Sequence, residues 1–145
     1  MQKNKLNKKI RIGYYSADFR EHAMSYLLAN LFEQHDKTKF ELIAFSFGSG
    51  KNDEIRNRIS SSFDKFIDVN LKSDKEIFQL SRDLKIDIAV DLMGFTQNSR
   101  FNIFFQRCAP IQVNYLGYPG TLSANCIDYL IADKILIPKE NQKYF

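Results

Sequence analysis

Residues 11–28 read RIGYYSADFREHAMSYLL, and two predicted elements meet within them. Ile12 and Tyr14 alternate with charged residues or glycine, which is the pattern of a β-strand. From Met24 onward the apolar residues recur at helical spacing, which predicts an α-helix that ends near residue 35. The polar turn at residues 18–22 joins the two. In open α/β folds a ligand binds at the carboxyl end of such a strand, so this turn is the first candidate site.

The rest of the chain repeats this alternation of strand and helix. Ser73 and Glu76 have the spacing of a capping box, which predicts the start of a helix. Apolar patterns predict strands over residues 40–47, 63–69, 86–92, 111–115 and 129–132, and helices over residues 53–61, 74–84 and 102–108. Such alternation is typical of a parallel sheet. The sequence therefore predicts an α/β fold, a Rossmann-like parallel sheet with helices on both faces.

Composition and charge limit the class of protein. A chain of 145 residues with 44% hydrophobic residues is long enough for one domain with a sizeable core. The net charge is +4, and four of the lysines lie within residues 1–9, while the later ones are mixed with acids. This pattern indicates a solvated tail rather than a nucleic-acid site. No apolar run approaches the roughly 20 residues of a membrane span, so we expect no membrane partner.

The cysteine content indicates the cellular compartment, and the composition of the segments indicates how the chain is divided. Cys108 and Cys126 are too few for a disulfide scaffold and lack the spacing of a zinc site, so we expect a cytoplasmic protein without bound metal. We expect a polar lead-in at residues 1–9, the Rossmann-like lobe at residues 10–138, and at residues 139–145 the start of a connection to a second lobe, without a closing helix.

Three polar turns follow strands that should be parallel. They cover residues 18–22, 94–100 and 117–121. Because the carboxyl ends of parallel strands meet at one edge of a sheet, we expect these turns to lie together. Their convergence is a stronger argument for a site than any single motif.

His22 and Asp18 are the candidate catalytic residues of the first turn. His22 lies just before a predicted helix, whose N-terminal partial charge favours the neutral, basic form of imidazole. Asp18 could orient the ring or accept a proton itself. The alternative is that both side chains only cap the helix and satisfy backbone donors.

The other turns also have two interpretations. Thr96, Gln97, Asn98 and Arg100 supply donors suited to sugar hydroxyls or phosphate, but an ordinary polar turn capped by Ser99 would have the same composition. Residues 117–120 have the two glycines and the proline of a plain tight turn. Residues 48–51 lack the spacing of a phosphate-binding loop and are interpreted as a flexible turn.

Three segments of the chain resemble those of a known protein family. Residues 13–19, GYYSADF, followed by His22, resemble the start of the catalytic region in O-GlcNAc transferases and SPINDLY-like glycosyltransferases. Residues 91–96, DLMGFT, resemble the second turn of that family. The most specific block is CAPIQV at residues 108–113, which leads into LGYPGT at residues 116–121. The match covers about residues 10–138 in the right order.

The resemblance implies the N-terminal lobe of a GT-B type glycosyltransferase. Such enzymes move GlcNAc from UDP-GlcNAc to Ser or Thr of proteins, with inversion and without a metal or other cofactor, because the UDP-sugar is a substrate. The implied partners are an acceptor protein or peptide, the nucleotide-sugar donor, a second catalytic lobe that grips the nucleotide, and an upstream tetratricopeptide array. We expect these 145 residues to be inactive alone.

The resemblance also assigns roles to particular positions. His22 matches a histidine placed between acceptor and donor sugar, and Asp18 matches an aspartate proposed as the base. The implied substrate-binding residues are Thr96, Gln97, Leu116, Gly117, Tyr118, Pro119, Gly120 and Thr121. Ala23 and Gln97 depart from the family pattern, which affects acceptor choice more than reaction type.

Two further hypotheses stay open. A relative of this family could use fucose or glucose as its donor sugar. Alternatively, the chain could be a non-catalytic Rossmann-like module that binds a protein or a sugar-phosphate.

Overall fold

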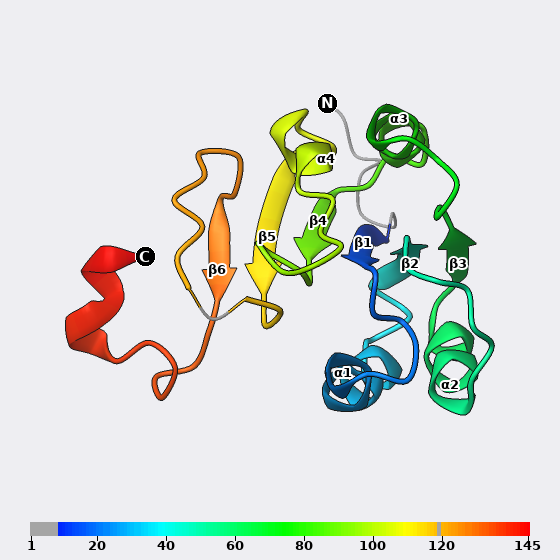
Figure 1. Ribbon diagram of the computed structural model, residues 1–145, viewed down its shortest axis with the longest axis horizontal. Coiled ribbons are helices and arrows are strands. Elements are labelled where there is room, and N and C mark those ends of the chain that lie inside the picture. The colour runs from blue at the N-terminus through cyan, green and yellow to red at the C-terminus, as the bar shows by residue number, and fades with distance from the viewer. Residues whose placement is uncertain (1–8, 119) are drawn as a thin grey trace, which may run out of the picture.

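The computed structural model describes residues 9–118 and 120–145, and its centre is a six-stranded sheet in which every neighbouring pair is parallel (Figure 1). The strand order is β3-β2-β1-β4-β5-β6. The strands are β1 (Ile10–Ser16), β2 (Phe40–Ser46), β3 (Lys65–Asp68), β4 (Ile88–Asp91), β5 (Ile111–Tyr115) and β6 (Tyr129–Ile131). The predicted Rossmann-like sheet is confirmed.

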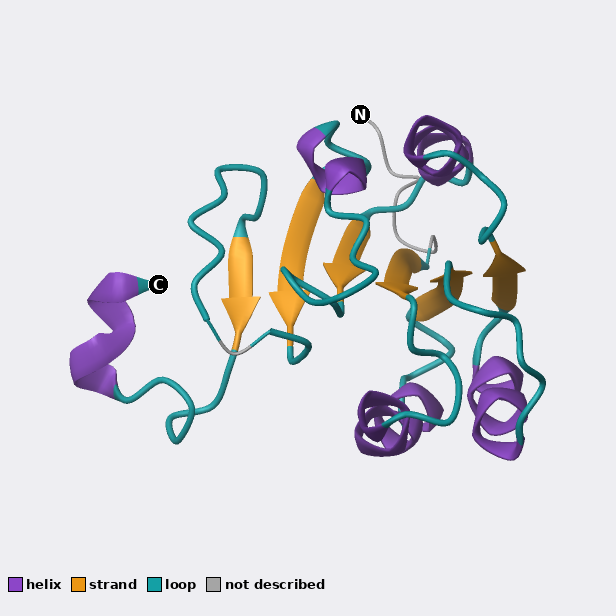
Figure 2. Ribbon diagram, in the orientation of Figure 1, coloured by secondary structure: helices purple, strands orange, loops and turns teal. Residues whose placement is uncertain are grey.

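Helices cover both faces of this sheet, as predicted (Figure 2). Helices α1 (Ala23–Glu33) and α2 (Glu54–Ser62) lie side by side on one face. Helices α3 (Asp74–Asp83) and α4 (Asn102–Phe105) cover the other face. A 3-10 helix, η1 (Lys139–Tyr144), follows β6. The capping box predicted at the start of α3 is present, since Ser73 and Glu76 each bond the other's backbone.

The core consists of two hydrophobic layers, because successive residues of a strand point to opposite faces. Tyr14 packs into the layer beneath α1 and α2, where its ring lies edge-on to Phe32 with centroids 5.0 Å apart. Tyr15 points the other way and stacks on Phe45 at 4.4 Å, in the layer beneath α3 and α4. Because both layers are buried, the central strands are apolar almost throughout.

The strand order has a topological switch point between β1 and β4. The chain runs from β1 outward to β2 and β3, and then returns to the other side of β1 to form β4. In folds of this kind ligands bind in the crevice at the carboxyl ends of the two strands that flank the switch point. The turns after β1 and β4 therefore occupy the expected ligand position.

Two local predictions were wrong. The helix expected over residues 102–108 ends at Phe105, because Arg107 adopts a left-handed backbone conformation with φ 60°. The C-terminal segment, expected to lack a helix, forms η1. In the alternative interpretation of the second turn Ser99 was the cap, but its hydroxyl donates to the Gly94 carbonyl.

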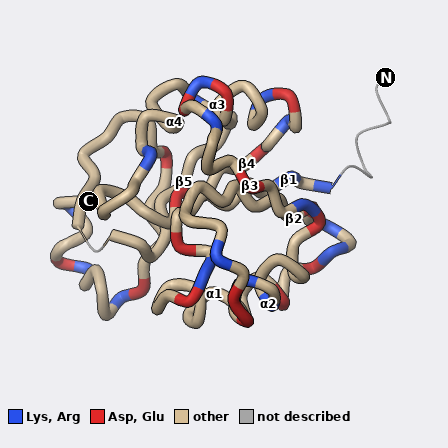
Figure 3. The backbone as a smooth tube through the Cα atoms, turned by 45° about the vertical axis from the view of Figure 1, so that its right-hand side comes forward, with Lys and Arg blue, Asp and Glu red and all other residues tan. Residues whose placement is uncertain are grey.

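Acidic and basic residues are interspersed along the described chain (Figure 3). Within that part of the chain, no helix combines the length and the apolar character that crossing a membrane requires.

Candidate functional site

The turn after β1 places Asp18 and His22 at the switch point. The apolar strand ends at Ser16, whose hydroxyl accepts from the Asp18 amide at 2.9 Å and so bends the chain out of the sheet. The Phe19 side chain, only 2% exposed, anchors the turn in the layer beneath α1. His22 follows as the N-cap of α1 with extended backbone. Asp18 thus lies between the buried strand and the Phe19 anchor, and His22 lies between that anchor and α1.

The His22 ring caps α1 through Nδ1, which accepts from the Met24 amide at 3.3 Å. A ring nitrogen that accepts a hydrogen bond carries no proton, so a neutral ring has its proton on Nε2. The side chain is 37% exposed. The capping alternative is therefore correct in part, but it uses only Nδ1, and Nε2 has no hydrogen-bond partner among the described residues.

Asp18 lies within reach of two basic groups. Its Oδ1 accepts from Arg20 at 3.2 Å, and its Oδ2 lies 3.8 Å from Nδ1 of His22. The Asp18 side chain is only 14% exposed. This arrangement suits a residue that would balance the charge of a protonated imidazole better than one that meets a substrate directly.

The turn after β4 contacts the turn after β1 through Met93. The Met93 sulfur lies 3.5 Å from both the Ala17 amide nitrogen and the Ser16 hydroxyl oxygen, and each donates to it. Met93 itself is 1% exposed. The first two predicted turns are therefore joined at the switch point, as their positions in the sequence suggested.

Two buried polar residues, missed as site residues by the sequence reasoning, shape the second turn. The Asp91 carboxylate accepts from the amides of Met93 and Gly94, both at 2.9 Å, and from the Asn114 side chain at 3.0 Å. Burial raises the pKa of Asp91, and the three donors oppose that shift. The signal was present in the sequence, since Asp91 and Asn114 are polar residues that directly follow valine near the ends of their strands.

The turn after β5 lies directly against the turn after β4. A side chain at Gly117 would meet the Leu92 carbonyl oxygen at 1.8 Å, so only glycine allows this approach. Gly94, with φ +57°, packs similarly against Tyr118, whose ring is edge-on to Phe95 at 5.8 Å. All three predicted turns therefore meet along one edge of the sheet.

The remaining candidate residues of these turns differ in their exposure and in their hydrogen bonds. The Thr96 hydroxyl donates to the Met93 carbonyl at 2.9 Å, while Gln97 is exposed. Leu116 and Gly120 are half-buried, and Pro119 lies outside the described residues. Arg100, expected to offer donors to a ligand, instead bonds Asp74 at 2.6 Å and backbone carbonyls that precede α3.

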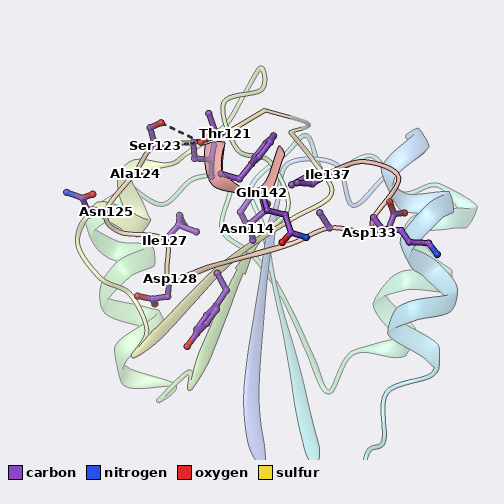
Figure 4. Close-up of a pocket in the computed structure, with 16 residues that line it drawn as sticks. Asn114, Thr121, Ser123, Ala124, Asn125, Ile127, Asp128, Asp133, Ile137 and Gln142 are labelled. Carbon is purple, nitrogen blue, oxygen red and sulfur yellow. Dashed lines mark hydrogen bonds between the residues drawn. The ribbon is translucent and has the colours of Figure 1, made fainter. Parts of the chain in front are cut away.

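A cavity of about 620 Å³ lies beside this edge, between residues 121–134 and η1 (Figure 4). Of the described candidate residues only Thr121 lines it. Asn114 also lines it, and its Oδ1 is buried without a hydrogen-bond partner among the described residues. Neither His22 nor Asp18 reaches this cavity. Over residues 9–118 and 120–145, no group of three His, Cys, Asp or Glu side chains could hold a metal ion.

The sheet topology defines the class of protein as a Rossmann-like lobe whose candidate site lies at the carboxyl edge of its sheet. Comparisons with known proteins give the family: the chain belongs to glycosyl transferase family 41, whose profile matches residues 1–145. It is 39% identical over 131 residues to a probable UDP-N-acetylglucosamine–peptide N-acetylglucosaminyltransferase SEC of Arabidopsis thaliana, covering 90% of this chain and 13% of that protein. It is 33% identical to the corresponding transferase of Caenorhabditis elegans, covering 90% and 11%.

A solved structure agrees with this assignment. A mutant O-GlcNAc transferase from Thermobaculum terrenum superimposes with a TM-score of 0.89 at 33% identity, covering 95% of this chain and 26% of that one. The fold is therefore that of the Rossmann-like GT-B lobe in this family. The chain spans about an eighth of the two curated relatives and about a quarter of the solved chain.

Proposed function

We propose that this chain is the N-terminal, acceptor-side lobe of an inverting, metal-independent glycosyltransferase. The full protein would transfer GlcNAc from UDP-GlcNAc to Ser or Thr of an acceptor protein. The observation that supports this most directly is the position of His22 at the switch point between β1 and β4, in a chain of family 41. The related proteins are named as UDP-N-acetylglucosamine–peptide transferases.

The proposed chemistry is an in-line attack of the acceptor hydroxyl on the anomeric carbon of the sugar. The C–O bond to UDP breaks as the new C–O bond forms, and the hydroxyl proton passes to the phosphate of the departing UDP or to water. We assign His22 the role of donating from Nε2 to a substrate oxygen, because its Nδ1 is engaged by Met24. Asp18, at 3.8 Å, would balance the charge if Nδ1 became protonated. A positioned acid–base group contributes about 10²–10⁴-fold to such a rate.

The other members of the site complete the proposal. Gln97 and Thr96 would contact the acceptor, and residues 116–121 would form one wall of the sugar pocket. No cofactor is proposed, since the nucleotide sugar is itself the substrate. The second lobe would hold the nucleotide, so the 145 residues alone would show no turnover. An upstream tetratricopeptide array and a cytoplasmic location also stay predictions.

The test replaces His22 in the protein encoded by the full open reading frame. His22→Asn is preferred to alanine, because asparagine still caps a helix. We expect turnover to fall about 100-fold or more while UDP affinity stays within twofold. Glu21→Ala is the matched control, since that exposed side chain makes no hydrogen bond among the described residues. Near wild-type turnover in His22→Asn would refute the assignment.

Donor identity is tested separately with the wild-type protein. Hydrolysis and transfer are measured with UDP-GlcNAc, UDP-glucose and GDP-fucose as separate donors. A preference for either of the last two would replace the proposed donor and leave the lobe assignment intact. Absence of turnover with all three would favour a non-catalytic binding module.

A further inference from the structure

We propose that Arg56 and Asp53, in and before the first turn of α2, are positioning residues for the turn that carries Asp18 and His22. This inference rests on the proposed function, because it assigns them to the same site. Neither residue belongs to the three strand-end turns. Both reach the candidate site from the next strand–helix unit of the chain.

The Arg56 guanidinium holds the turn by its backbone. Nη1 donates to the Phe19 carbonyl at 2.8 Å and to the Ser46 hydroxyl at 3.0 Å, at the end of β2. Nη2 donates to Asp68 at 3.2 Å, at the end of β3. The side chain is 12% exposed and lies over the Phe66 ring at 4.8 Å. One arginine therefore ties the site turn to the ends of two strands.

Asp53 provides the second attachment. Its Oδ1 accepts from the Arg56 amide at 2.8 Å, which caps α2. Its Oδ2 accepts from the Glu21 amide, also at 2.8 Å. The segment between Asp18 and His22 is thus held at Phe19 and at Glu21, on both sides of Arg20. We call four of these contacts the α2 brace. They join Arg56 to Phe19, Ser46 and Asp68, and Asp53 to Glu21.

The local energetics of α2 do not explain an arginine at this position. A cation in the first turn of a helix opposes the positive N-terminal end of the helix dipole. The long-range contacts of Arg56 compensate for this cost. Arg58, two residues later on the same helix, instead faces outward and forms an exposed pair with Glu33 of α1. The two arginines therefore provide a natural comparison between a brace contact and a surface contact.

The expected consequence concerns turnover rather than binding. Displacement of a catalytic group by about 1 Å can cost about 100-fold in rate. Without the brace, the Asp18–His22 turn is still anchored by the Phe19 side chain, so the fold should persist. We therefore expect kcat to fall, while the KM for the UDP-sugar stays close to the wild-type value.

The experiment uses the full-length protein with three variants. Asp53→Asn keeps one oxygen to cap α2 but removes the second acceptor from the Glu21 amide. Arg56→Met removes the guanidinium and keeps the apolar stem, and Arg58→Met is the matched control. Each variant is measured for kcat, for KM, and for hydrogen exchange of the peptide that covers residues 17–24.

In Asp53→Asn we expect exchange of the Glu21 amide to rise about three- to tenfold, as for one lost hydrogen bond. We expect kcat to fall about tenfold or more in Asp53→Asn and Arg56→Met, and less than twofold in Arg58→Met. Unchanged exchange in Asp53→Asn would overturn the brace. Faster exchange with an unchanged kcat would overturn its positioning role. A wild-type protein without transferase activity would refute the proposed function instead, and the exchange result would still decide whether the brace exists.

Discussion

Replacing Gly117 by alanine would force a methyl group against the backbone of the neighbouring turn. The new Cβ would lie 1.8 Å from the Leu92 carbonyl oxygen and 2.4 Å from its carbon. Ordinary contact begins near 3.4 Å, so the two backbones must separate by about 1.6 Å. The obstacle is main chain, so no side-chain rotation can relieve it. This substitution therefore tests whether the turns after β4 and β5 form one packed unit.

The magnitude follows from the cost of overpacking. Inserting a methyl group into a packed site costs about 1–3 kcal/mol, and a backbone obstacle puts Gly117→Ala at the upper end. Alanine also restricts the unfolded chain more than glycine does, which offsets about 0.5 kcal/mol of this loss. We expect a net loss of about 2–3 kcal/mol in the free energy of unfolding. For a chain of this size the melting temperature would fall by about 6–10 °C.

The assay is urea denaturation followed by circular dichroism, with Gly50→Ala as the control. A Cβ at Gly50 would meet only the end of the Asp68 side chain, at 3.2 Å, which can move aside. The control should stay within about 0.5 kcal/mol of the wild type. Equal stability of Gly117→Ala and Gly50→Ala would show that the two turns are not packed as described, and would refute the reasoning.

Three further predictions concern the core and one ion pair. Burial raises the pKa of the Cys108 thiol to about 11, so iodoacetamide at pH 7.5 should modify it only after unfolding, as measured by mass spectrometry. Tyr15→Phe should cost about 1–2 kcal/mol in urea denaturation, because the Tyr15 hydroxyl bonds Ser81 at 2.6 Å inside the core. The hydrogen bond from Arg107 lowers the pKa of Asp128, so the stability gained from this pair should be present above about pH 4 and lost as the pH falls. The measurement is the difference in unfolding free energy between the wild type and Asp128→Asn as a function of pH.

Each of these has a contrasting measurement. Burial also raises the pKa of Cys126, but this thiol is only partly buried and should react faster than Cys108 in the native protein. Equal rates for both thiols would contradict the first prediction. Tyr26→Phe, at an exposed position, should leave stability unchanged and is the control for the second. A wild-type advantage over Asp128→Asn that persists undiminished at pH 2 would contradict the third.

The sequence predicted the sheet well, because the strands are apolar or alternating runs bounded by polar turns. The prediction that three turns share one edge was also correct, since it followed from parallel topology alone. The length of α4 was not predictable in the same way. Cys108 follows Phe104 at helical spacing, but the left-handed backbone of Arg107 interrupts the helix before it. Ser99 has the composition of a cap, but its hydroxyl bonds the Gly94 carbonyl five residues earlier in the same turn.

The candidate site was predictable only where the chain is locally polar. His22 and Asp18 lie in a polar turn between an apolar strand and a helix with an apolar face, and so could be found. Arg56 lies 37 positions from its partner Phe19, and no local pattern connects them. Asp53 and Glu21 are likewise 32 positions apart. Contacts of this kind depend on β1 and β2 being neighbours, which the order of elements along the chain does not show.

The α2 brace has a consequence for exchanging parts between related proteins. The Asp18–His22 turn is not a self-contained module, because two of its backbone groups are satisfied by the following strand–helix unit. A transplanted turn would keep its side chains but lose their alignment unless Asp53 and Arg56 moved with it. The segment that must be transferred as one piece to keep the Asp18–His22 turn aligned therefore extends from β1 to the start of α2.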